Sequence, residues 1–165
     1  MVTIGIDVGL TGAIAAIDQD EQLIGVEDLE VMVHGKVKWI DAQDLLGTIR
    51  LMREGRPARA IVEQTQVMPK LGLQAAMSKG MTTGSVLAAL QIAGVSIELV
   101  QPAVWKRAHG LVAPKASDAE KKTASLTKAR MLFPTAELEL GKHHNRAEAL
   151  LIAHWAVRRK WSKAA

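Results

Sequence analysis

The sequence predicts an α/β protein with a mixed five-stranded sheet flanked by helices. Three segments with β-strand character come first, at 2–8, 12–18 and 22–33, and helical and strand patterns alternate after them. That order is typical of a sheet that starts with antiparallel strands and continues with parallel ones. The chain has 165 residues, 48% of them hydrophobic and 23% charged, which is enough for one sizeable core. We therefore expect residues 1–165 to form a single domain.

Each later element has its own signals. Asp41 is a helix N-cap, and Leu45 and Ile49 lie on one face of the helix that follows, which Gly55 and Pro57 end. The remaining elements are expected in this order: a strand at 58–63, a loop at 64–72, an apolar helix at 73–93, a strand at 95–100, a short helix from Pro102 to Trp105, a loop at 109–118, a helix capped by Ser117 or Asp118 and ended by Phe133 and Pro134, and a helix at 145–160.

Composition excludes several classes of protein. The chain has no cysteine, which rules out disulfide and thiolate chemistry, and it shows neither a signal peptide nor a long apolar run. We expect a cytoplasmic protein, in a bacterial cell or a phage-infected one. The net charge of +4 mildly favours a polyanionic partner. With four Trp, one Phe and no Tyr, a broad aromatic surface for stacking bases is not expected.

Three acidic residues lie in segments that are otherwise apolar and are predicted to be buried. Asp7 ends a buried strand and precedes a turn that contains Gly9 and Gly12, and Glu63 ends the strand at 58–63. Glu148 lies in the first turn of a final helix that is apolar nearly all round. A buried carboxylate needs a cation or a hydrogen-bond donor. Strand order, with these acids at the strand ends and in the last helix, is that of the ribonuclease-H-like fold.

Helical geometry selects one neighbour of Glu148. At about 100° per residue, His144 lies roughly 40° from Glu148 and Asn145 roughly 60° from it, whereas His143 lies on another face. Three carboxylates and the His144 imidazole suit two divalent cations about 4 Å apart, which can activate water and stabilise a leaving phosphodiester oxygen. His144 is alternatively a solvated loop histidine, or a general base that touches no metal.

The chain resembles the RuvC-type Holliday junction resolvases, in particular their phage-type members, over about residues 2–158. The resemblance rests on a run of motifs in a fixed order: Ile4-Gly5-Ile6-Asp7-Val8-Gly9-Leu10-Thr11-Gly12-Ala13, Val62-Glu63-Gln64, Met68-Pro69, Gly80 and Gly84, Pro102-Ala103-Val104-Trp105-Lys106, Leu132-Phe133-Pro134, and Arg146-Ala147-Glu148-Ala149-Leu150-Leu151-Ile152-Ala153.

This resemblance implies a ribonuclease-H-like fold, a homodimer, Mg²⁺ or Mn²⁺, and paired nicking of four-way DNA junctions. It matches Asp7, Glu63 and Glu148 to the family's acids, and Lys106 and Lys122 to lysines near the scissile phosphate. The chain departs at the fourth acid, because relatives usually carry Asp three or four residues before the last one, and here Asn145 and His144 stand there.

Other residues are candidates for contacts with DNA and between subunits. The positions that could line a phosphate track are Lys70, Lys79, Arg107, Lys115 and Arg146. Apolar side chains around 64–84 either pack in the core or wedge into an opened junction, namely Met68, Leu71, Leu73, Met77 and Met81. The helix at 73–93 is too apolar for a solvent face, so we expect it to form a twofold-symmetric homodimer through Leu73, Met77, Val86, Leu87, Leu90 and Ile92.

Two other function classes remain. The missing fourth acid is also compatible with a non-catalytic protein that binds branched DNA with this fold. The segment Asp7-Val8-Gly9-Leu10-Thr11-Gly12 resembles the phosphate-binding turn of actin-like ATPases, but those proteins need two such domains, so this chain would be only a fragment of one.

Overall fold

The structure is a computed structural model, and it describes residues 1–65 and 72–159. Five strands form one sheet in the order β3-β2-β1-β6-β7, with β1 spanning Val2–Asp7, β2 Ala13–Ile17, β3 Leu23–Asp28, β6 Ala58–Glu63 and β7 Ser96–Val100. β1 pairs antiparallel with β2 and parallel with β6, β2 is antiparallel to β3, and β6 is parallel to β7. This confirms the predicted mixed sheet.

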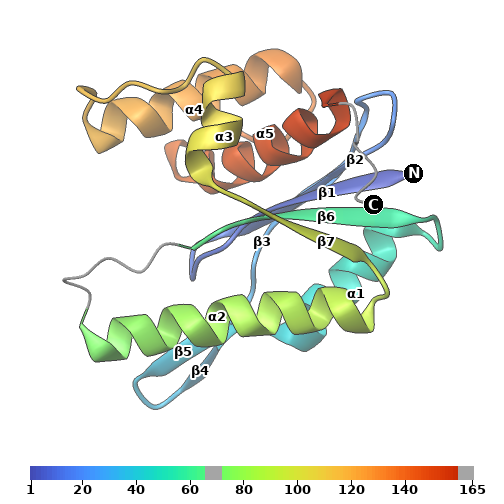
Figure 1. The fold of residues 1–165 in the computed structure, drawn as a ribbon, viewed down its shortest axis with the longest axis vertical. Coiled ribbons are helices and arrows are strands. Elements are labelled where there is room, and N and C mark those ends of the chain that lie inside the picture. The colour runs from blue at the N-terminus through green and yellow to red at the C-terminus, as the bar shows by residue number, and fades with distance from the viewer. Residues whose placement is uncertain (66–71, 160–165) are drawn as a thin grey trace.

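Helices cover both faces of the sheet (Figure 1). α1 (Ala42–Arg53) and α2 (Leu73–Ile92) lie on one face, and α3 (Pro102–Ala108), α4 (Asp118–Leu132) and α5 (His144–Arg158) lie on the other. A short 3₁₀ turn, η1 (Gly141–His143), precedes α5. In the described part of the chain, no helix combines the length and the apolar character that crossing a bilayer requires.

Local sequence explains the helix ends. The Asp41 carboxylate accepts hydrogen bonds from the backbone N–H groups of Gln43 and Asp44, at 2.9 and 3.1 Å, and so caps α1. Ser117 caps α4 in a capping box with Glu120, which decides between the two predicted caps. α3 extends to Ala108, three residues beyond its predicted end, and α5 begins at His144, one residue earlier than predicted.

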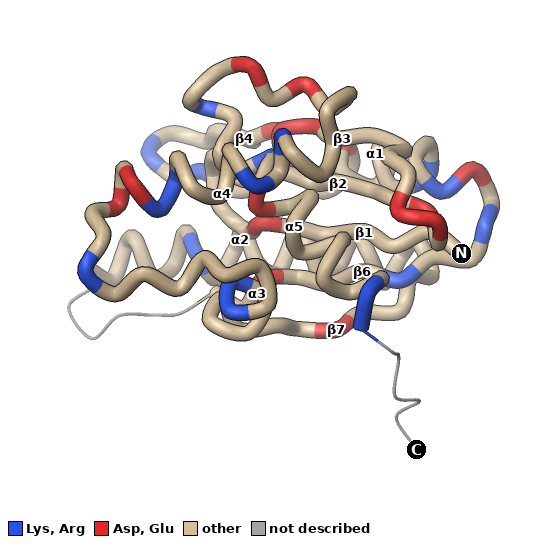
Figure 2. The backbone as a smooth tube through the Cα atoms, turned by 90° about the horizontal axis from the view of Figure 1, so that it is seen from above, with Lys and Arg blue, Asp and Glu red and all other residues tan. Residues whose placement is uncertain are grey.

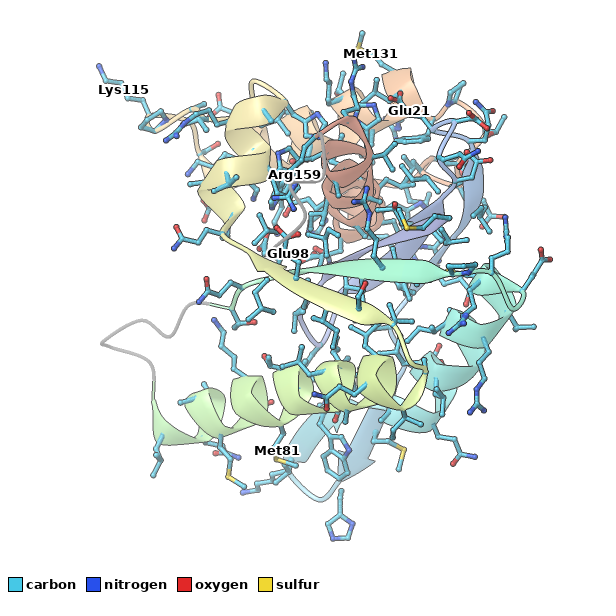
Figure 3. The ribbon with its side chains drawn as sticks, turned by 45° about the vertical axis from the view of Figure 1, so that its right-hand side comes forward. Glu21, Met81, Glu98, Lys115, Met131 and Arg159 are labelled. Carbon is cyan, nitrogen blue, oxygen red and sulfur yellow. The ribbon has the colours of Figure 1, made fainter. Side chains whose placement is uncertain are left out.

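The third predicted strand, 22–33, was wrong in its extent. β3 ends at Asp28, and a separate hairpin follows, made of β4 (Val31–His34) and β5 (Val37–Ile40). The Leu29 N–H donates to the Gly12 carbonyl at 2.9 Å, which turns the chain out of the sheet. Gly35, with φ of 60°, then makes the tight turn of the hairpin. Figure 3 shows Met81 on the side of α2 that faces this hairpin.

The predicted subunit surface on α2 also needs correction. Val86 and Leu90 are fully buried in the core of this chain, against β1, β6 and α1, so they cannot face a partner. By contrast, Leu73, Met77 and Ile92 are 88, 58 and 67% exposed. The reason is that α2 serves as one wall of its own core, and its apolar character mostly reflects that packing.

Candidate metal and phosphodiester site

Strand alternation places two acids on the same face of the sheet. In β1 the even-numbered residues Val2, Ile4 and Ile6 belong to the core beneath α1 and α2, so the odd-numbered residues point to the other face. Asp7 therefore projects toward α5. Ile6 pairs with Val62 in the parallel ladder between β1 and β6, which sets Glu63 next to Asp7 on that face.

A glycine lets α5 approach the sheet closely enough to add the third acid. A Cβ built on Gly5 would overlap the Ala149 carbonyl oxygen and would lie 2.6 Å from the Ala153 nitrogen, so only glycine fits there. This contact packs the middle of α5 against β1. The result is a cluster in which one carboxylate oxygen from each of Asp7, Glu63 and Glu148 lies within 4.8 Å of the others. We call these three residues the acid triad.

Hydrogen bonds orient two members of the acid triad. The indole N–H of Trp105, which is fully buried, donates to Glu63 Oε2 at 2.7 Å. The Ser125 hydroxyl donates to Glu148 Oε1 at 3.0 Å, and Lys106 Nζ lies 3.2 Å from the same oxygen. Sequence reasoning missed Trp105 and Ser125 as site residues. A signal for Trp105 was present, because a buried tryptophan needs an acceptor for its N–H and it stands next to Lys106.

The electrostatics of the acid triad are unfavourable without a cation. Burial, followed by the nearby carboxylates of Glu63 and Glu148, raises the pKa of Asp7 to about 8, although Lys106 acts in the opposite direction. Burial also raises the pKa of Glu63, against the lowering effect of the Trp105 hydrogen bond. Oxygen ligands that converge and repel one another are the donor set that Mg²⁺ and Mn²⁺ take. The residues present therefore fit a divalent metal.

The acid triad opens into a hollow of about 360 Å³ that Asp7 and Glu148 line with three lysines, Lys106, Lys121 and Lys122. In Figure 2 the Lys and Arg positions of α3 and α4 lie on either side of the acidic positions near α5. Lys121 forms an ion pair with Asp118 at 3.4 Å. A phosphodiester in this hollow would meet both carboxylates and ammonium groups, because Lys106 lies directly beside Glu148. Lys106 and Lys122, the two lysines named by the resemblance, both line this hollow, and so does Lys121, which had not been expected.

His144 lines the same hollow, but its ring nitrogens are not part of the close acid triad. Its Nδ1 lies 3.4 Å from the Gly141 carbonyl oxygen. Asn145 lines the hollow too, and its side-chain amide donates to the Thr11 carbonyl oxygen in the turn after Asp7. Asn145 thus fastens α5 to that turn. His143 is buried and lines no part of the hollow, in agreement with the prediction that it lies on another face.

The basic residues of the predicted phosphate track lie in different environments. Arg146 forms a two-point ion pair with Asp28, at 2.8 and 2.9 Å, and lies 3.6 Å from Glu137, which argues against a free role on DNA. Arg107 and Lys115 are exposed, and Lys79 is half-buried beside a second, larger hollow. Lys70, Met68 and Leu71 lie outside the described residues. Met81 is half-buried and Leu73 and Met77 are exposed, so the packing predicted for these side chains is only partial.

Comparisons with known proteins support the predicted fold and resemblance. A chloroplastic Holliday junction resolvase, MOC1 of Chlamydomonas reinhardtii, is 38% identical over 108 residues, which cover 63% of this chain and 12% of that protein. This chain thus spans a small part of the length of that relative. No protein-family model matches the sequence.

Solved structures agree over nearly the whole chain. RuvC from T. thermophilus in complex with a Holliday junction substrate matches with a TM-score of 0.62 and 22% identity, over 95% of this chain and 93% of that one. A structure described as Thermus thermophilus RuvC matches with a TM-score of 0.53 and 23% identity, over 95% of this chain and 94% of that one. These matches, together with the sheet topology, confirm the predicted ribonuclease-H-like fold.

Proposed function

We propose that this chain is a metal-dependent endonuclease that resolves four-way DNA junctions by nicking two phosphodiesters. The observation that carries the proposal is the acid triad, three converging carboxylates beside a hollow lined with lysines. The similarity to MOC1 and the fold shared with RuvC support the same activity and substrate class.

The residues have distinct roles in this proposal. Asp7, Glu63 and Glu148 would hold two Mg²⁺ or Mn²⁺ ions, and His144, which lines the same hollow, would take the place of the family's usual fourth acid. The bound metal would supply a Lewis acid and an activated water for phosphodiester hydrolysis. Trp105 and Ser125 fix the Glu63 and Glu148 carboxylates, because each donates a hydrogen bond to one of their oxygens.

Lysines would act on the phosphate itself. Lys106 Nζ, 3.2 Å from Glu148, is close enough to the acid triad to neutralise charge that develops on the phosphodiester oxygens. Lys122 lines the other side of the hollow and forms no ion pair with any described residue. Arg107 and Lys115, on the exposed surface next to α3 and α4, are positioned for contacts with flanking phosphates.

A nicking assay on a synthetic four-way junction tests the proposal. With Mg²⁺ or Mn²⁺ we expect two symmetric nicks near the crossover, and a linear duplex of the same sequence should stay intact. Junction binding without cleavage under any divalent metal would instead support the non-catalytic branched-DNA-binding protein. ATP hydrolysis without action on DNA would support the actin-like fragment. The cytoplasmic setting expected from the sequence stays a prediction.

We further propose that the chain acts as a homodimer through α2. Gly80, Gly84 and Ala88 recur every four residues on the exposed side of this helix. A Cβ on either glycine would meet nothing within 4 Å, so the fold of this chain does not require them. A helix-interior glycine costs about 1 kcal/mol relative to alanine. Close approach of a second α2 would account for both glycines.

Light scattering distinguishes a dimer through α2 from a monomer or from a dimer through another surface. Wild-type protein should be a dimer at micromolar concentration, and Gly84→Leu should be monomeric with paired nicking reduced to single nicks. Gly47→Leu is the matched control, because Gly47 is also an exposed helical glycine with no atom near its Cβ position, on α1. A monomeric wild type, or a Gly84→Leu variant that stays dimeric, would contradict the interface.

A further inference from the structure

A second hollow borders the turn that follows Asp7, and it shares no lining residue with the hollow at the acid triad. It has a volume of about 650 Å³ and lies between that turn and the N-terminal half of α2. Val8, Gly9 and Leu10 form one wall, and Ala75, Ser78 and Thr82 belong to the opposite wall. Because Val8 directly follows Asp7 in the chain, a group in this hollow would lie near a phosphate bound at the acid triad.

One polar atom in this hollow has no partner. The Thr82 side chain is 2% exposed, and its Oγ1 makes no hydrogen bond with any described residue. Other hydroxyls of the wall are satisfied: Ser78 donates to the Lys38 carbonyl at 2.9 Å, and Thr65 lies 3.3 Å from the Thr83 hydroxyl. A buried hydroxyl without a partner costs about 1–3 kcal/mol. A ligand that supplies a donor or an acceptor at this hollow would satisfy the Thr82 hydroxyl.

We propose that this hollow accepts the unstacked nucleobase of a nucleotide that flanks the scissile phosphate, and that Thr82 hydrogen-bonds to an edge of that base. The inference rests on the proposed function, because the acid triad fixes the phosphate. Apolar walls of Val8, Leu10 and Ala75 suit the faces of a base, and one buried hydroxyl among them suits its edge. Extruded bases are held elsewhere by the same combination of apolar contact and hydrogen bonds to the edge.

Lys79 strengthens the choice of a nucleotide over an apolar ligand. It lines the same hollow from α2, so a cationic side chain is available near the sugar-phosphate backbone of a nucleotide bound there. A base at this position makes Thr82 a specificity-determining residue for the nick, since only some bases match a single hydroxyl. The chain would then prefer particular bases at one position next to the cut.

Fluorescence of 2-aminopurine tests the occupant directly, because it rises when this base leaves a stack. Junctions would carry the probe at each nucleotide around the crossover, with the Asp7→Asn variant preventing cleavage. When the protein binds, we expect the fluorescence to increase severalfold for the probe at one position in each of the two nicked strands. The increase should be lost when Ala75→Phe fills the hollow, while affinity for the junction is kept. Ala124→Phe, an exposed alanine of α4, is the matched control.

Cleavage by the otherwise wild-type protein tests the role of Thr82. Junctions with each of the four bases at the identified position should be nicked at different rates. Thr82→Val should reduce the ratio between the fastest and the slowest nicking rate by about fivefold, which corresponds to the loss of one hydrogen bond. Thr127→Val, the same change at an exposed site on α4, should leave that ratio unchanged.

The outcomes separate the two proposals. A junction that is bound and nicked without any fluorescence change, or with the same change in Ala75→Phe, overturns the base pocket and leaves the proposed function standing. If Ala75→Phe instead converts a dimer into monomers, the hollow belongs to the subunit contact and the base pocket is wrong. A chain that neither binds nor nicks the junction overturns both.

Discussion

The two ends of helix α5 carry polar clusters of opposite character. At its N-terminal end Glu148 meets Asp7 and Glu63, three like charges in a half-buried site. At its C-terminal end the arginines have hydrogen-bond acceptors: the buried Arg59 donates to the Thr3 hydroxyl at 3.1 Å and to the Ala156 carbonyl at 2.8 Å. Arg159 pairs with Glu98 of β7, and Figure 3 shows the two residues close together.

The difference shows which end is built for stability and which is not. Hydrogen-bond acceptors satisfy Arg59 and an opposite charge pairs with Arg159, so the burial of these two groups is compensated. At the N-terminal end Lys106 is the one cation that forms an ion pair with the acid triad among the described residues. Burial, together with the converging carboxylates, raises the pKa of Asp7 to about 8 and so lowers the stability of the metal-free fold. A bound metal would remove that penalty.

The largest effect that would sharpen this comparison is expected for Asp7→Asn. It should reduce metal-dependent nicking by about a thousandfold or more, while junction affinity changes little because phosphate contacts supply most of it. A carboxyl whose folded pKa is raised to about 8 lowers stability progressively as the pH rises from 3.8 toward 8. Asp7→Asn should therefore stabilise the metal-free protein at pH 8 by about 2–4 kcal/mol in urea denaturation.

Glu139→Gln is the control for that experiment, because Glu139 is an exposed carboxylate away from the acid triad. It should leave nicking and stability unchanged. Near-normal nicking by Asp7→Asn would remove the catalytic assignment, and lower stability of the variant at pH 8 would show that the acid triad is not a source of repulsion.

The second effect concerns the close contact between Gly5 of β1 and the middle of α5. Gly5→Ala should destabilise the fold by about 3 kcal/mol or more, because the new methyl group overlaps the Ala149 backbone and must push α5 away from β1. Gly47→Ala, with open space around its Cβ position on α1, should instead stabilise by up to about 1 kcal/mol. Thermal unfolding of both variants measures the two changes in stability. Equal changes in Gly5→Ala and Gly47→Ala would contradict the close contact between Gly5 and α5.

The third effect is smaller and concerns the C-terminal half of α5. Burial lowers the pKa of His154 below its usual value of 6.5, although Glu21, 3.3 Å from its Nε2, acts in the opposite direction; His109, Lys128 and Arg158 also face it. A histidine with a lowered folded pKa costs stability as the pH falls below 6.5, at most about 1.4 kcal/mol per pH unit.

Replacing His154 by Phe tests that slope. The variant should lose less stability than the wild type between pH 7 and pH 5 in urea denaturation. Only the difference between the two proteins is informative, because Asp7 contributes with the opposite sign in the same range. Identical slopes would mean that His154 stays neutral, or is equally protonated, in both the folded and the unfolded chain.

The smallest expected effect concerns His144 at the edge of the acid triad. Imidazole is a poorer ligand for Mg²⁺ than for Mn²⁺, so the wild type should nick faster with Mn²⁺. His144→Asp adds an oxygen ligand in the same hollow and should shift the ratio of the two rates toward Mg²⁺ by about tenfold. His144→Ala with unchanged rates in both metals would make His144 a bystander, and Asn145 would then be the residue to test.

Much of this architecture follows from local patterns. The alternation in β1 and β6, the caps at Asp41 and Ser117, and the run of small and apolar residues in α5 each predict an element and its buried face. Parallel pairing of β1 with β6 then follows from the fold class, and so does the meeting of Asp7 with Glu63. The hairpin at 31–40 did not follow, because its turn at Gly35 interrupts a run that also fits one long strand.

By itself the sequence determined the fold class and the identity of the acid triad, because these three acids lie in segments whose apolar pattern predicts burial. Only the tertiary structure decided which groups hold those acids, because Trp105 and Ser125 come from helices far from them in the chain. It also decided that Arg146 is already paired with Asp28, that Val86 and Leu90 face inward, and that Thr82 has no partner. Such partnerships depend on how elements pack, which spacing along one element does not encode.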